Sequence, residues 1–191
     1  LCKDFPEANS ILRRVSITQH LERRDYLNFL QAFMQNDIAY ADSLMNEFVI
    51  RYPGGDYTND AIYLMMLSLS MDQEDQRKFV DSIALLHLHR SAGVDSLVSI
   101  FVHNQDEELL ILAIEWAIGM GAYDKAILLL EHPFTDPLAM DYSQLLKLAL
   151  LNDDNDRQVL AREFLKTTPN SVFSPNFRQT INRMSSPKPS L

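Results

Sequence analysis

Two histidines at positions 87 and 89 are the residue types in this chain most able to bind a metal or transfer a proton. On a helix, side chains two positions apart lie about 200° apart around the axis, so the two rings cannot chelate one ion. A helical metal site needs a spacing of three or four and a carboxylate nearby. We therefore interpret His87 and His89 as two partly exposed histidines.

Two acidic clusters have the composition of cation or acid–base sites. His103 lies close to the carboxylates of residues 106–108, at a predicted helix junction. Carboxylates there favour the positive end of the helix dipole, so we interpret the cluster as a helix start. Residues 152–156 are similar to a calcium loop, but they lack its glycine at the sixth position, and helical sequence resumes at Arg157. We interpret them as a loop with an N-cap.

The sequence contains no glycine-rich phosphate loop, no nucleophile elbow and no paired-cysteine spacing. Its single cysteine, Cys2, excludes an intrachain disulfide. We therefore expect no metal, no cofactor and no catalytic residue, and the chain is not predicted to be an enzyme.

Charge and composition exclude several classes of partner. The 191 residues carry a formal net charge of −9 and no basic patch, which argues against binding nucleic acid or an anionic membrane surface. No apolar run approaches the roughly 18 residues of a membrane span. With 47% hydrophobic residues, the chain has the composition of a soluble globular protein.

Apolar residues recur three and four positions apart along the chain, which predicts an all-α fold without strands. We expect residues 1–7 to be a flexible lead-in, 8–184 a single helical-repeat domain, and 185–191 a disordered tail. Polar, glycine and proline breaks separate the predicted helices. These helices cover residues 8–35, 38–52, 58–71, 76–90, 94–103, 106–120, 123–132, 137–151, 156–167 and 175–184.

Antiparallel helices with short connections form either a closed bundle or an open stack of hairpins. A helix stop recurs at Pro53, Gly93, Pro133 and Pro169, five positions after an apolar residue each time. The intervals of 40, 40 and 36 residues lie in the range of helical-hairpin repeats, about 34 to 47 residues. The stops therefore favour the open stack.

The residues around one of these stops resemble the second helix of a tetratricopeptide repeat. Ala41, Met45, Phe48 and Pro53 have the family's order of a small residue, two packing residues and a proline. Residues 121–126 resemble the family's turn between helices, although the helix that follows is about one turn short. The resemblance implies a right-handed α-solenoid of four to five antiparallel helical hairpins.

Residues 48–63 are similar to a turn found in tetratricopeptide proteins of the bacterial envelope, with Gly55 where serine is usual. This resemblance implies a periplasmic or outer-membrane-associated location, with a cytoplasmic location as the alternative that the sequence leaves open. It also makes Cys2 a lipidation candidate, as the first residue of a mature lipoprotein, although Leu1 stands where a small residue is usual.

The resemblance implies a non-catalytic scaffold or adaptor that binds a protein or peptide. The first helix of each pair lines the concave side of such a stack, where Tyr26, Tyr63 and Met66 are our candidates for contacting a partner. Two alternatives stay open. The first alternative is a helical-bundle enzyme or small-molecule binder with an enclosed pocket. The second is a structural repeat segment of a longer chain.

Overall fold

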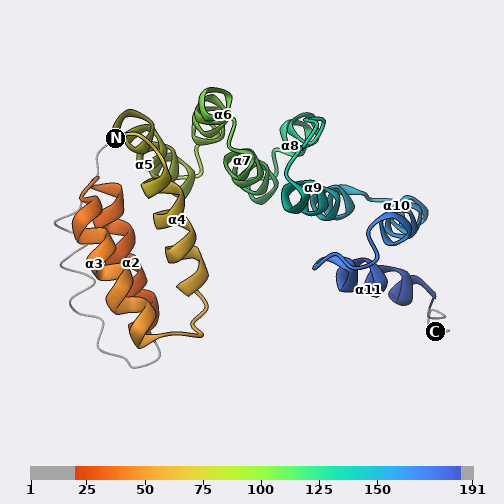
Figure 1. The fold of residues 1–191 in the computed structure, drawn as a ribbon, viewed down its shortest axis with the longest axis horizontal. Helices are drawn as coiled ribbons and strands as arrows, with labels where there is room; N and C mark the ends of the chain where they lie inside the picture. Colours follow the sequence, from red (N-terminus) through yellow and green to blue (C-terminus); the bar gives the residue numbers. More distant parts are fainter. Residues whose placement is uncertain (1–19, 186–191) are drawn as a thin grey trace. The chain divides into compact units, whose positions relative to one another are not determined.

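The structure, a computed structural model, describes residues 20–185, which form ten helices and no strand (Figure 1). The predicted all-α class is confirmed for these residues. Residues 1–7, Cys2 and the tail beyond Ser185 lie outside the described part. The helices are α2 (Leu21–Met34), α3 (Ile38–Arg51), α4 (Thr58–Ser70), α5 (Gln73–His87), α6 (Ala92–Asn104), α7 (Glu107–Gly119), α8 (Tyr123–Leu129), α9 (Pro137–Leu150), α10 (Asp154–Thr167) and α11 (Ser174–Ser185).

Aspartates start half of these helices. In each case the carboxylate accepts a hydrogen bond from a backbone N–H of the first turn, which otherwise has no partner within the helix. The five N-caps are Asp37, Asp72, Asp106, Asp136 and Asp153. Asp106 and Asp153 confirm that both acidic clusters contain helix starts. Asp72 corrects the predicted start at residue 76, because its cap lets α5 begin at Gln73.

The histidine pair lies at the end of a helix and not within one. Helix α5 ends at His87, three residues before the predicted end, and His89 adopts a left-handed backbone conformation with φ of 54°. The N–H of His89 donates to the carbonyl of Leu86 over 2.8 Å, and that of Arg90 donates to Leu85 over 3.0 Å. These bonds form a Schellman C-cap, so the pair's backbone terminates α5.

Gly93 does not stop a helix, contrary to the repeat pattern predicted from the sequence. It lies in the first turn of α6 and is buried. A Cβ atom at this position would lie 2.6 Å from Cγ of Leu86 and 2.8 Å from the backbone oxygen of Ser82. Glycine therefore allows the start of α6 to approach α5 closely. The stops at Pro53, Pro133 and Pro169 do follow helix ends.

Replacing Gly93 with alanine should lower the free energy of unfolding by about 1–3 kcal/mol, because the added methyl overpacks a contact with backbone. The matched control is Gly119→Ala at the end of α7, where a Cβ meets nothing within 4 Å. That change should be neutral or stabilising by up to about 1 kcal/mol, since alanine favours helix. Urea unfolding measures both variants, and a Gly93→Ala protein as stable as the wild type would contradict the close approach.

The described part of the chain divides into two compact units, and the boundary falls between Ser96 and Leu97, within α6. In the first unit α2 and α3 form a hairpin, seen side by side in Figure 1, and α2 also packs against α5. Phe29, Phe33 and Phe79 are fully buried between these helices. Aromatic side chains from α2 and α5 therefore make the centre of this unit's core.

In the second unit α7 packs against both α8 and α9, and α10 packs against α11. All six residues from 109 to 114 are apolar and buried, so this part of α7 lies in the interior of the unit. A smaller cluster joins α9, α10 and α11. Its buried members are Leu148, Ala161, Phe164 and Phe177.

Candidate functional site

An open groove of about 530 Å³ lies within the second unit, where α8, α9 and α10 meet. Its volume falls in the range of ligand sites, roughly 300–1,000 Å³. Six of its residues are apolar and form the floor. They are Ile127, Leu130, Leu150, Leu151, Val159 and Leu160. Ile127 is 51% exposed and Val159 is 48% exposed, so part of the floor is open to solvent.

One of the helices that line the groove is short. Helix α8 has 7 residues and α10 has 14, so they extend about 10 Å and about 21 Å. Helix α8 follows a turn at Gly121, which has a φ of 73°, and ends before Pro133. Within α8 only Ala126 is buried. The short helix predicted from the spacing of Ala126 and Pro133 therefore keeps most of its side chains at least partly accessible, and Ile127 is among those that line the groove.

The other four lining residues are charged, and we call them the rim. They are Glu131, Asp156 and Glu163, with Lys147 as the one basic residue of the lining. Within residues 20–185, none of the three carboxylates makes an ion pair or accepts a hydrogen bond. Acids outnumber the base by two, so the rim is negatively charged and available to an external cation.

Glu107 fixes the loop that follows α8. One of its carboxylate oxygens accepts hydrogen bonds from the backbone N–H (2.7 Å) and the hydroxyl (2.9 Å) of Thr135, and the other accepts from the N–H of Asp136 (2.9 Å). Burial raises the pKa of Glu107, but the hydrogen bonds from Asp136 and Thr135 outweigh it and hold that pKa below its ordinary value. The carboxylate therefore anchors the start of α9 to the start of α7.

His132, in the same loop, is held by two aromatic rings and a carboxylate. Its imidazole makes T-shaped ring contacts with Phe101 and with Phe134, and the ring centroids are 5.1 Å apart in both pairs. Its Nε2 atom lies 3.6 Å from an oxygen of Glu107. These contacts place the end of α8, and with it Glu131, at the edge of the groove.

The three residues predicted to contact a partner lie in the first unit, outside this groove. Tyr26 is buried and its ring stacks on Tyr57 at 4.8 Å, so it belongs to the core and not to a binding face. Burial, with smaller contributions from Asp60 and Tyr57, raises the pKa of Tyr26. Tyr63 is half-buried, and Met66, three residues later on α4, is 66% exposed.

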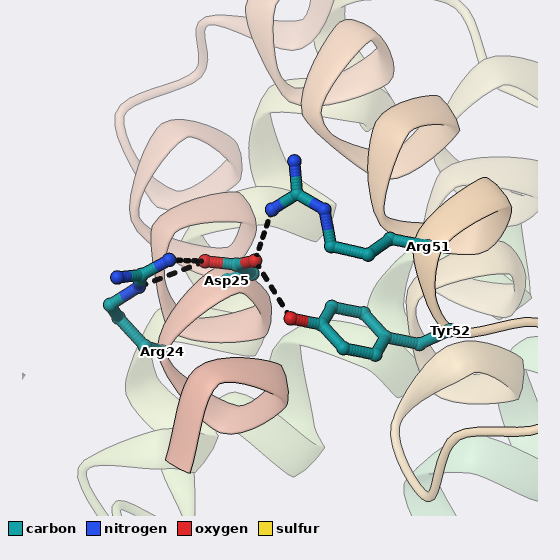
Figure 2. A network of polar contacts seen from close by, with 4 residues as sticks. All are labelled: Arg24, Asp25, Arg51 and Tyr52. Carbon is teal, nitrogen blue, oxygen red and sulfur yellow. Dashed lines mark hydrogen bonds and ion pairs between the residues drawn. The ribbon is translucent and has the colours of Figure 1, made fainter. Parts of the chain in front are cut away.

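Figure 2 shows a polar network in the first unit centred on Asp25. One carboxylate oxygen of Asp25 accepts from Arg24, at 2.7 and 2.9 Å, and the other accepts from Arg51 at 2.6 Å and from the Tyr52 hydroxyl at 3.1 Å. Burial raises the pKa of Asp25, but the hydrogen bonds from Arg24, Arg51 and Tyr52 outweigh it and hold the pKa below its ordinary value. The network ties α2 to the end of α3.

Replacing Asp25 with asparagine should lower the free energy of unfolding at pH 7 by about 1–2 kcal/mol. This is less than a fully buried charged network would contribute, because the side chain of Arg51 is exposed to solvent. A depressed pKa stabilises the fold above the unfolded pKa of about 3.9, and this contribution is lost as pH falls through the lower folded pKa. The difference from wild type should therefore shrink between pH 5 and pH 3 in urea titrations. Asp56→Asn, at an exposed loop position, is the control, and a gap that stays constant with pH would contradict the network.

Neither a metal centre nor a membrane span is found in the part of the chain that the structure describes. Across residues 20–185, no three side chains of His, Cys, Asp or Glu gather as metal ligands would. Each helix in that range is too short or too polar to cross a bilayer.

The groove, and not the histidines or the acidic clusters, is therefore the candidate site. Its lining includes no serine, cysteine or histidine, and it offers apolar surface beside carboxylates without a partner in the described residues. Comparison with known proteins adds no family to this geometry: no family model matches the chain, and no curated protein or solved structure is similar to it.

Proposed function

We propose that this chain is a non-catalytic helical scaffold whose groove at α8, α9 and α10 binds a protein or peptide partner. The observation that carries the proposal is the apolar floor, with Ile127 and Val159 about half exposed beside carboxylates that have no partner in the described residues. Contiguous apolar surface rimmed by polar residues is typical of a protein interaction site. Binding would remove the floor from water and pair the rim.

The pattern of helices supports the same proposal. Hairpin partners pack together at α2–α3 and α7–α8, as expected of a tetratricopeptide-like stack. Pro53, Pro133 and Pro169 each follow a helix end. We propose the solenoid arrangement on this basis, whereas an envelope location and a lipid anchor at Cys2 stay predictions from the sequence resemblance.

A small apolar molecule is the second candidate occupant, because the groove's volume is also that of a small-molecule site. Such ligands are usually enclosed and fixed by a few convergent polar groups. Here the polar groups are charged and stand on the rim, which favours a partner that brings its own charges. Native mass spectrometry of the purified chain separates the two, since a tightly held small molecule adds a discrete mass.

Site-specific photo-cross-linking tests the proposal. A photoreactive amino acid replaces Val159 in the groove, and in a matched control it replaces Val172, which is 71% exposed and outside the groove. We expect one defined protein adduct in the native cell from position 159 and none of that mass from position 172. The same adducts from both positions, or no adduct from position 159, would contradict a groove-bound protein partner.

A further inference from the structure

We infer that the occupant of this groove is an amphipathic helix with an apolar stripe flanked by lysine or arginine side chains. The inference rests on the proposed function and specifies the chemistry of the partner. It comes from two properties of the lining: the spacing of charged and apolar residues along α10, and the excess of carboxylates around the floor.

Helix α10 presents an acidic–apolar–acidic stripe to the groove. Asp156 and Glu163 are seven residues apart, which places them on the same side of the helix, two turns from each other. Val159 and Leu160 lie between them at the third and fourth positions and also line the groove. An occupant lying along α10 therefore meets a carboxylate, an apolar patch and a second carboxylate in that order.

The dimensions fit two to three turns of helix. The segment from Asp156 to Glu163 extends about 10 Å, which matches the rise of about seven helical residues. A helix fills a groove between other helices with apolar residues at positions i, i+3 or i+4, and i+7. An extended peptide usually binds by adding a strand to a sheet edge, and residues 20–185 contain no sheet.

The rim selects the charge of the occupant. Glu131, which follows α8, lines the groove together with Asp156 and Glu163 of α10, so carboxylates come to it from two separate elements and can pair with basic side chains that flank an apolar stripe. Lys147 is the exception in the lining, and a neutral or acidic residue facing it would fix the direction of the bound helix. An acidic helix of the same shape would meet like charges and be rejected.

Selection from a display library tests this inference with the whole chain as bait. The library holds random 16-residue peptides and is counter-selected against the Ile127→Asp variant, so that only groove-dependent binders survive. We expect enriched peptides with an apolar i, i+3 or i+4, i+7 pattern flanked by lysine and arginine. Groove-dependent peptides that are acidic, proline-rich or without helical periodicity would overturn the inferred partner and leave the proposed function standing. No groove-dependent peptide at all would overturn both.

A charge series then tests the rim with the most enriched peptide, followed by fluorescence anisotropy. The triple variant Glu131→Gln, Asp156→Asn and Glu163→Gln removes the three carboxylates of the groove. The control, Glu47→Gln, Asp56→Asn and Asp60→Asn, removes the same charge at three exposed positions of the first unit. Each set includes one aspartate from the first turn of a helix, so loss of dipole stabilisation is matched.

The triple variant should raise the Kd for the peptide by about 10-fold in 50 mM salt, and by less in 500 mM salt, where charges are screened. The control should change the Kd by less than about 2-fold. An equal loss in both variants would mean that the peptide responds to net charge alone, and no loss in either would mean that the rim does not contact it. Either result overturns the inferred basic flanks. Circular dichroism of both variants confirms that the helices are retained.

Discussion

Replacing Phe177 with alanine should lower the free energy of unfolding of the second unit by about 3–5 kcal/mol. The side chain is fully buried, and its ring stacks on Phe164 with centroids 3.9 Å apart. Leu148 and Ala161 complete the cluster. Alanine removes most of this contact and leaves a cavity in the cluster that joins α11 to α9 and α10.

This change matters for the groove because α10 forms one of its walls. Leu160 packs against the Phe177 cluster and also lines the groove, so loss of this packing should loosen the groove and lower peptide affinity together with stability. Trp116, the chain's single tryptophan, lies on α7 and reports unfolding of this unit by fluorescence. The control is Gln179→Ala, at an exposed position of α11, and its free energy of unfolding should stay within about 0.5 kcal/mol of wild type. A Phe177→Ala protein within 1 kcal/mol of wild type would show that α11 does not support α10.

In the first unit, replacing Phe33 with alanine should also cost about 3–5 kcal/mol. Phe33 of α2 and Phe79 of α5 are both fully buried, and their rings meet edge to face at 6.1 Å with an interplanar angle of 89°. Phe29, one turn earlier on α2, contacts the ring of Phe33, with ring centroids 6.0 Å apart. The truncation therefore leaves a cavity where α2 docks on α5.

A double-mutant cycle separates the ring contact from the general loss of burial. Phe33→Leu, Phe79→Leu and the double variant keep apolar volume and remove the aromatic pair. The cycle should return a coupling energy of about 0.5–1.5 kcal/mol from urea unfolding followed by circular dichroism. A coupling energy near zero would indicate that the two rings stabilise the fold only through buried area.

Sequence patterns predicted most of the helices because apolar spacing and capping residues are local signals. The unbroken apolar run at residues 109–114 matches their burial. The aspartates at the two helix starts, Asp106 and Asp153, are capping residues that can be recognised in the sequence. Gly93 shows where local signals fail. Glycine both ends helices and permits close contacts, and only the position of Leu86 on α5 decides between these roles.

The candidate site was less predictable because it depends on how helices pair. Tyr26 has the amphipathic side chain that is common at binding faces, but it is buried, and its ring stacks on that of Tyr57. Because this contact comes from outside α2, the sequence of α2 alone does not indicate that Tyr26 is buried. One local signal did point to the groove. The short distance from Ala126 to Pro133 predicted a truncated helix, and α8 is truncated where the groove opens.

A second signal lies in α10, which has more apolar residues than one packed face requires. Ala161 and Phe164 are buried in the cluster with α11, while Val159 lies outside that cluster and is 48% exposed. The groove that we propose as the binding site therefore combines an exposed apolar side chain of α10 with the short helix α8.

Two neighbouring residues of α8 provide the most direct test of the groove. Ile127 lines it and is 51% exposed, whereas Leu128 is 64% exposed and does not line it, so aspartate at either position carries the same cost to the helix. The measurement is the Kd of each variant for the basic amphipathic peptide. We predict that Ile127→Asp weakens binding by at least about 10-fold and Leu128→Asp by less than about 2-fold, a difference of about 1 kcal/mol or more. Equal affinities for the two variants would contradict the assignment of this groove as the binding site.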